Sequence, residues 1–196
     1  MENKGFLLVL MQPPPAFEDE FNAWYDTEHV PERLAVPGFE TALRYMCISG
    51  APRYLAMYDI QTPAVLDSEA YLRVSFDRSS PWTKRVTSRV NVYRSAGRQV
   101  YPGAAVTTGA PRTLLLRFRN VMRSAESTIV AGVRANFESR PEVAQSRVFA
   151  HDNGSSVDYL CLVEARAPFD ATLDTAPFAD YRDALDMINE YARYMT

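Results

Sequence analysis

The chain of 196 residues carries one order of predicted strands and helices twice, and this repetition restricts the fold more than any other feature. The first half is predicted to contain a strand over residues 5–11, a helix over 16–30, strands over 39–49 and 53–61, a helical region over 65–76 and a strand near 90–95. Turn residues Gly50 and Pro52 join the two middle strands as a hairpin. Pro31 must end or kink the first helix, since proline lacks the backbone N–H that a helix interior needs.

The later part of the chain repeats this order. Its predicted elements are a strand over residues 112–120, a helix over 125–137, strands over 143–152 and 157–166, a helix over 177–188 and a short strand over 190–196. Comparison of residues 43–60 with 146–165 matches Arg44 to Arg147, and Tyr54 and Leu55 to Tyr159 and Leu160. We interpret these matches as an internal duplication.

Small and turn-forming residues mark the junction between the two halves. Residues 102–111 form the predicted linker, which leaves one half over 1–101 and another over 112–196. Each half has the order β-α-β-β-α-β, the ferredoxin-like unit. A four-stranded antiparallel sheet with both helices on one face leaves an apolar face that must be covered. We therefore expect an α+β fold in which tandem ferredoxin-like repeats pack sheet to sheet as an intrachain pseudo-dimer, so that the protein is a monomer or a homodimer.

The composition of the chain limits the classes of binding partner and the cellular location that we expect. The formal net charge of −3 and the pI near 5.5 disfavour binding to nucleic acid or to acidic membranes. No apolar run is long enough for a signal-peptide core or a membrane span, so a cytoplasmic location is predicted. Cys47 and Cys161 lie within predicted strands, and we expect both to be reduced, buried thiols.

The stretch "EFNAWYDTEHVPERLAVPGFETALRY" carries the most distinctive pattern of the chain. Its aromatic pair, Glu-His, proline and Pro-Gly followed by an "RY" strand resemble the dimeric α/β-barrel superfamily, most closely its EthD-like branch. The resemblance implies a ferredoxin-like barrel with a pocket between helices and sheet. Such relatives include cofactor-free monooxygenases, cyclases, isomerases, dehydratases and haem-binding enzymes, and many have no assigned activity. The second half lacks the Trp-Tyr and Glu-His pattern.

Helical spacing places the aromatic and polar residues of this stretch on one broad face. Tyr25 and His29 lie four residues apart, and Trp24 and Glu28 form the adjacent stripe. His29 beside a tyrosine hydroxyl can act as a general base, because the ordinary pKa of histidine is about 6.5. The alternative remains open that His29 is structural and binds the free carbonyl groups at a helix end, with Trp24 in the core.

The predicted strands and a basic stretch supply further candidates. Tyr45 and Tyr58, with Arg44, would give the pocket polar groups on an aromatic wall suited to a flat carbonyl-bearing or phenolic ligand. Residues 78–98 contain six basic residues and no acid, a pattern that indicates either a solvated surface or an anion site. His151 is expected in an exposed turn.

Two functional hypotheses follow, with a third as a further alternative. In the first, a cofactor-independent enzyme uses His29 and Tyr25 as catalytic residues, and Trp24, Glu28, Arg44, Tyr45 and Tyr58 contact a small aromatic, polyketide-derived or lactone substrate. Its class as isomerase, cyclase, lyase or monooxygenase stays open. In the second, the protein is a non-catalytic ligand-binding or structural member of the superfamily. Haem ligation by His29 is the third, and the residues carry no metal-site spacing or nucleotide motif.

Overall fold

A computed structural model describes residues 3–168 and 170–195, and its strands form one closed antiparallel barrel. The strand order around the barrel is β1-β3-β2-β8-β5-β7-β6-β4. The strands of the first half are β1 (Gly5–Gln12), β2 (Leu43–Ser49), β3 (Tyr54–Ile60) and β4 (Asn91–Tyr101). Those of the second half are β5 (Arg112–Val121), β6 (Val143–Asp152), β7 (Val157–Ala165) and β8 (Leu185–Arg193).

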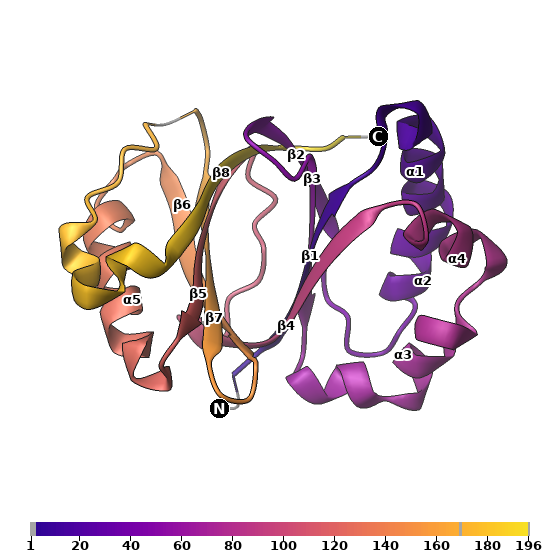
Figure 1. Ribbon diagram of the computed structural model, residues 1–196, viewed down its shortest axis with the longest axis horizontal. Coiled ribbons are helices and arrows are strands. Elements are labelled where there is room, and N and C mark those ends of the chain that lie inside the picture. Colours follow the sequence, from indigo (N-terminus) through magenta and orange to yellow (C-terminus); the bar gives the residue numbers. More distant parts are fainter. Residues whose placement is uncertain (1–2, 169, 196) are drawn as a thin grey trace.

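The two halves join edge to edge at both sides of the barrel. β2 pairs with β8, and β4 pairs with β6. The last strand of each half therefore pairs with the second strand of the other half. The helices lie outside, with α1 to α4 beside the first half and α5 beside the second (Figure 1). The expected pseudo-dimer of ferredoxin-like repeats is thus confirmed, and the barrel closes within a single chain. The boundaries proposed for the halves, 1–101 and 112–196, stay a prediction.

The helical segments of the first half are short. They are η1 (Pro15–Phe17), α1 (Glu18–Trp24), the π-helix η2 (Tyr25–His29), α2 (Val30–Leu34), η3 (Pro63–Asp67), α3 (Glu69–Arg73), η4 (Phe76–Arg78) and α4 (Pro81–Thr87). The first helix therefore continues past Pro31 instead of ending there. The N–H of Val30 donates to the carbonyl of Tyr25, and this wider turn directly precedes the proline, which occupies the first turn of α2.

The second half contains η5 (Arg123–Ala125), α5 (Glu126–Phe137) and η6 (Ala176–Ala184). The helix predicted over residues 177–188 is wrong in its second part, because β8 begins at Leu185. Met187, Asn189 and Tyr191 alternate with more exposed residues and turn toward the barrel interior, which is the period of a strand. Of the strand predicted over 190–196, the part beyond Arg193 is not strand, and Thr196 lies outside the described residues.

Three apolar clusters hold the molecule together. One lies between the first sheet and α1–α4, a second lies between the second sheet and α5, and a third fills the barrel interior. Arg44 and Arg147, which the sequence comparison matched, point to opposite sides of their sheets. Arg44 contacts the aromatic rings of the first helical layer, whereas Arg147 pairs with Asp59 inside the barrel. The two matched arginines therefore do not occupy equivalent positions in the two halves.

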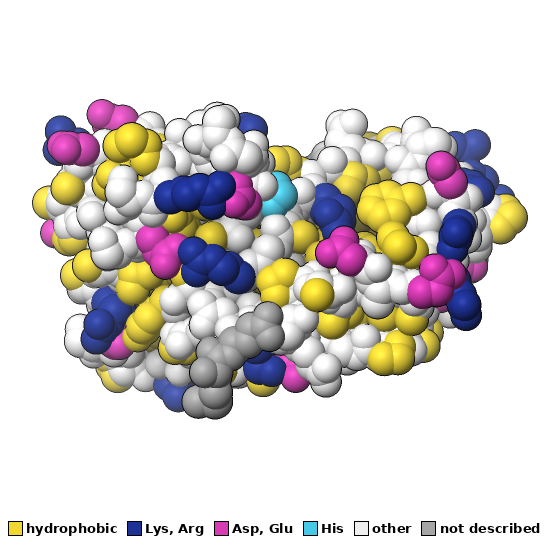
Figure 2. Space-filling view, turned by 90° about the horizontal axis from the view of Figure 1, so that it is seen from below, with side chains coloured by type: hydrophobic (Ala, Val, Ile, Leu, Met, Phe, Trp, Pro, Cys, Tyr) yellow, Lys and Arg dark blue, Asp and Glu magenta, His cyan; other side chains and the backbone are white. Residues whose placement is uncertain are grey.

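The cysteines and His151 differ in part from expectation. Cys161 is a buried free thiol, but Cys47 is a free thiol only partly buried. His151 lies in β6 rather than in a turn and is partly buried, with its Nδ1 2.7 Å from the carbonyl oxygen of Ala96. The basic side chains visible on one face are interspersed with acidic ones instead of forming a continuous patch (Figure 2). Among the described residues, no helix has the length and apolar character needed to cross a membrane.

Candidate functional site

The helix formed by α1, η2 and α2 places an aromatic cluster against the first sheet. Phe21, Trp24 and Tyr25 are all buried on the inner face. His29 follows on this face, with its ring centroid 4.3 Å from that of Trp24 and 5.0 Å from that of Tyr25. The helical spacing in the sequence thus brings together three of the predicted site residues.

A cavity of about 260 Å³ opens beside this cluster, between the helices and the outer face of β1 and β4. Its apolar floor includes Leu7, Val9 and Met11, which alternate along β1. Its polar lining consists of Tyr25, His29, Arg33, Tyr71, Ser75, Ser79, Thr83, Thr87 and Arg94. The cavity thus combines an apolar wall with convergent polar groups, and both features are found in small-molecule sites.

His29 presents an unpartnered nitrogen in this region. Its Nδ1 is buried and has no hydrogen-bond partner. Burial, followed by the positive charges of Arg33 and Arg44, lowers the pKa of His29 well below its ordinary value of 6.5. The imidazole is therefore neutral at neutral pH, and its free nitrogen can accept a hydrogen bond from a ligand.

Tyr25 and Tyr58 form a buried pair of phenols. The hydroxyl of Tyr58 donates to that of Tyr25 at 3.2 Å, and burial raises the pKa of both. Both side chains therefore remain neutral at neutral pH. Tyr25 lines the cavity with His29, whereas Tyr58 supports Tyr25 from behind and does not line it.

Three other predicted residues lie outside the cavity lining. The guanidinium of Arg44 lies 4.3 Å from the ring centroids of both Tyr25 and Tyr194 and donates to Asp26 and Asn22, each at 2.5 Å. Glu28 accepts hydrogen bonds from Ser80 at 2.5 Å and Thr83 at 3.0 Å, which attaches α4 to the first helix. Tyr45 faces the barrel interior on the opposite side of the sheet.

Sequence reasoning missed Arg33, Tyr71, Ser75 and Arg94. Arg33 continues the spacing of Tyr25 and His29 by four more residues, so the same helical periodicity could have found it. Arg94 belongs to the basic stretch noted in the sequence. Tyr71 and Ser75 come from α3 and the loop after it, and no local pattern marks them as neighbours of His29.

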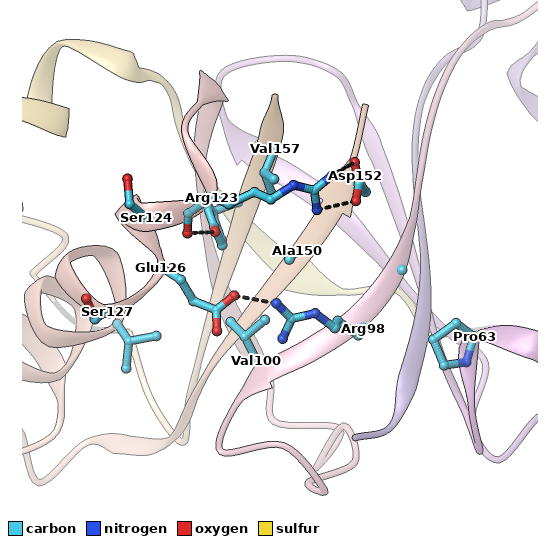
Figure 3. Close-up of a pocket in the computed structure, with 13 residues that line it drawn as sticks. Pro63, Arg98, Val100, Arg123, Ser124, Glu126, Ser127, Ala150, Asp152 and Val157 are labelled. Atoms are coloured by element: carbon cyan, nitrogen blue, oxygen red, sulfur yellow. Dashed lines mark hydrogen bonds and ion pairs between the residues drawn. The ribbon is translucent and has the colours of Figure 1, made fainter. Parts of the chain in front are cut away.

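A larger hollow of about 700 Å³ lies at the second half, between β4, β6 and the start of α5. Two ion pairs span its walls, Arg98 with Glu126 at 2.5 Å and Arg123 with Asp152 at 2.5 Å (Figure 3). Each guanidinium there already has a carboxylate partner, and none of the buried unpartnered polar atoms belongs to its lining. We therefore place the candidate site at the smaller cavity, because its lining residues His29 and Ser75 have buried polar atoms without a hydrogen-bond partner among the described residues.

Neither hollow fits a metal ion or haem well. Within residues 3–168 and 170–195, no three His, Cys, Asp or Glu side chains gather in a metal-binding arrangement. The His29 cavity, at about 260 Å³, is smaller than the roughly 300–1,000 Å³ of sites for drug-sized ligands. The larger hollow has no His, Cys or Met in its lining, and its Tyr159 hydroxyl donates to the carbonyl of Arg123 at 3.2 Å.

The lowered pKa of His29 predicts how the free energy of unfolding depends on pH. Because the unfolded chain binds a proton near pH 6.5 and the folded chain does not, the free energy of unfolding should fall as the pH falls through about 6.5. The slope from this group is at most about 1.4 kcal/mol per pH unit. Replacement His29→Gln should remove that part of the slope, measured by urea unfolding between pH 7.5 and 5. Parallel curves for the wild type and the variant would contradict the assignment.

No protein-family model and no curated protein matches this sequence. Solved structures match in fold. An anthrone oxidase-like protein is 8% identical over 100% of this chain and 92% of its own, with a TM-score of 0.70. A protein provisionally named a chlorite dismutase is 10% identical over 97% and 95%, with a TM-score of 0.62. A provisionally named monooxygenase from Lactobacillus acidophilus NCFM is 8% identical over 98% and 94%, with a TM-score of 0.58.

These similarities extend over the whole chain at very low sequence identity, so they define the fold and not the activity. The fold is a dimeric α/β-barrel, the fold expected from the stretch around Trp24 and His29. In this chain both halves of the barrel are covalently joined.

Proposed function

We propose that this protein is a cofactor-independent, EthD-like enzyme that transfers a proton at the His29 cavity. The observation that carries the proposal is the buried, unpartnered Nδ1 of a neutral histidine beside a small cavity. A neutral imidazole with a free nitrogen can serve as a general base that removes a proton from a carbon next to a carbonyl group or from a phenol. The proposed location is the cytoplasm, and a single chain suffices to close the barrel.

In the proposed step, the C–H or O–H proton of the ligand moves to Nδ1 of His29. From a phenol, the bonding pair stays on the oxygen; from a carbon acid, it forms the C=C bond of an enolate while the π pair of the carbonyl moves onto its oxygen. The receiving imidazole then carries its other proton on Nε2. The positive charge of Arg33, which lines the same cavity, stabilises the developing oxyanion. Tyr25 fixes the position of the ring of His29 by edge contact. Arg44, expected in the sequence to bind substrate, instead supports Tyr25 through its ring face.

The size and lining of the cavity favour a compact, flat ligand of one or two rings. The names of two structural neighbours, anthrone oxidase-like protein and monooxygenase, are compatible with a phenolic or ketonic ligand, and they add support at the level of the fold. Isomerisation, cyclisation, elimination and oxygenation can all begin with this proton transfer.

A non-catalytic role in ligand binding is the second candidate. It is favoured by the apolar wall that Leu7, Val9 and Met11 give the cavity, and it requires no proton transfer. The two candidates share the cavity and differ in whether His29 changes its protonation state when a ligand is bound.

Thermal unfolding with a panel of phenols, lactones and aromatic acids tests the proposed site. At a concentration of 100 times Kd, a ligand should stabilise the wild type by about 2.7 kcal/mol, which corresponds to a rise in Tm of roughly 5–10 °C. A folded His29→Ala variant should show a much smaller rise. The proposal fails if no compound raises the Tm of the wild type and the variant only loses about 1–3 kcal/mol of stability, because His29 is then a structural residue.

A further inference from the structure

Arg33 is a buried charge that lacks a carboxylate partner. The described residues include four buried arginines, namely Arg33, Arg44, Arg117 and Arg147. Three of them form ion pairs with carboxylates, Arg44 with Asp26, Arg117 with Asp186 and Arg147 with Asp59. Arg33, at 5% exposure, has no carboxylate oxygen of the described residues within 4.0 Å, and it is the one of the four that lines the His29 cavity.

The contacts of Arg33 are all neutral. One Nη1 bond of 2.9 Å runs to the carbonyl of Val74, and the guanidinium lies 5.3 Å from the ring centroid of Tyr71. The neighbouring acid, Glu32, is not in the cavity lining. Burial and the charge of Glu28 raise its pKa, and the charge of Arg33 opposes this rise without forming an ion pair within 4.0 Å. Since an arginine in a protein cannot lose its proton, this positive charge persists in the cavity at every physiological pH. Burial of an unpaired charge is costly, which indicates that a counter-ion comes from outside the chain.

A second group in the same cavity also lacks a partner. The hydroxyl of Ser75, a residue only 4% exposed, is buried without a hydrogen bond and lies in the lining with Arg33. Arg94 lines the cavity from β4 and donates to the hydroxyl of Tyr71 at 3.4 Å. A bound oxyanion can accept hydrogen bonds from both the guanidinium and the hydroxyl.

The net charge of the cavity indicates a ligand that already carries a negative charge before it binds. A neutral ligand that gives a proton to His29 leaves the net charge of the cavity unchanged, because the new imidazolium offsets the new oxyanion, and the excess positive charge of Arg33 remains. A ligand that carries a carboxylate neutralises Arg33 on binding. It does so whether or not a proton is then transferred.

We propose that the His29 cavity binds a small aromatic carboxylic acid as its anion, with Arg33 as the counter-ion and Ser75 as a hydrogen-bond donor to the carboxylate. This inference names the ligand class for the site of the proposed function and rests on that site. Proton transfer at His29 and carboxylate recognition at Arg33 are separate properties, so either can fail alone.

Calorimetric titration with phenylacetate and with its neutral amide, phenylacetamide, tests the inference. The wild type should bind phenylacetate about 10- to 100-fold more tightly than the amide, as expected for a charge-assisted hydrogen bond. Arg33→Gln should abolish this preference, whereas the control Arg89→Gln, at an exposed arginine outside the cavity, should keep it. Equal affinities of the wild type for acid and amide, or no binding of phenylacetate at millimolar concentration, would overturn the inference.

Two further variants keep the result interpretable. His29→Gln should retain the preference for the carboxylate even if it abolishes proton transfer, and this separates the inference from the proposed function. Without ligand, Arg33→Gln should leave the Tm unchanged or raise it, because a buried unpaired charge is removed. A large fall in Tm would instead assign Arg33 a structural role and contradict the inference.

Discussion

Replacement of Arg147 by methionine is expected to lower the free energy of unfolding by about 3–5 kcal/mol, the usual result of breaking a buried ion pair. Arg147 in β6 lies inside the barrel and is fully buried, with Nη1 2.6 Å from Asp59 Oδ1 at the end of β3 and Nη2 3.7 Å from Glu164 in β7. Its Nη2 also donates to the hydroxyl of Thr107, in the segment between β4 and β5. The variant leaves the charges of Asp59 and Glu164 buried without this partner.

Urea unfolding at neutral pH measures the loss, with Arg134→Met as the control. Arg134 of α5 forms an exposed pair with Glu138, which directly follows that helix, so its replacement should cost less than about 1 kcal/mol. If Arg147→Met does not fold, Arg147→Lys, which keeps the charge, provides the measurement and should lose less stability. A cost below about 1 kcal/mol for Arg147→Met would show that this ion pair does not hold the two halves together.

Asp59 connects this ion pair to acid stability. Burial alone would raise the pKa of Asp59, but Arg147, together with hydrogen bonds from Thr107 and Thr41, outweighs burial and lowers it. A carboxyl with a lowered pKa contributes stability at neutral pH, and that contribution is lost as the pH falls through the folded pKa. The interior ion pair therefore adds to the loss of stability in acid that His29 produces at somewhat higher pH.

The fold could be predicted because each half repeats a complete set of local signals. Apolar runs and turn residues marked the strands, and the need to cover two apolar sheet faces required the halves to join. The error at residues 177–188 arose because the alternation of Met187, Asn189 and Tyr191 competes with a helix-compatible composition. The passage of the first helix through Pro31 depends on a π-turn, for which the sequence carries no separate signal.

The candidate site could be predicted only along the helix. Spacing by four residues placed Tyr25 and His29 together, because neighbours on one helix face follow from the sequence alone. Strand alternation places Arg44 and Tyr45 on opposite sides of β2, but it does not show which of the two sides faces the helices. Tyr71 in α3 and Ser75 in the loop after it lie at the cavity only because of the tertiary fold. Glu28, expected to contact substrate, accepts hydrogen bonds from Thr83 of the distant α4 and from Ser80, which directly precedes that helix.

The variant His29→Gln is expected to slow proton exchange on a bound carbon acid by about 10²- to 10⁴-fold, the usual contribution of a positioned general base. Glutamine keeps a similar volume and can form hydrogen bonds, but it cannot take up the proton. His151→Gln is the matched control, because the second histidine of the chain lies in β6 and outside the lining of the cavity. Its exchange rate should equal that of the wild type.

The most direct measurement is the rate at which the methylene protons of phenylpyruvate exchange with deuterium in D₂O, followed by NMR with and without protein. This probe combines an aromatic ring, an ionised carboxylate and an acidic carbon next to a carbonyl. The proposed function predicts exchange faster than the uncatalysed rate with the wild type and with His151→Gln, and a return nearly to that rate with His29→Gln. Equal rates for the wild type, His29→Gln and the protein-free solution would contradict proton transfer at His29.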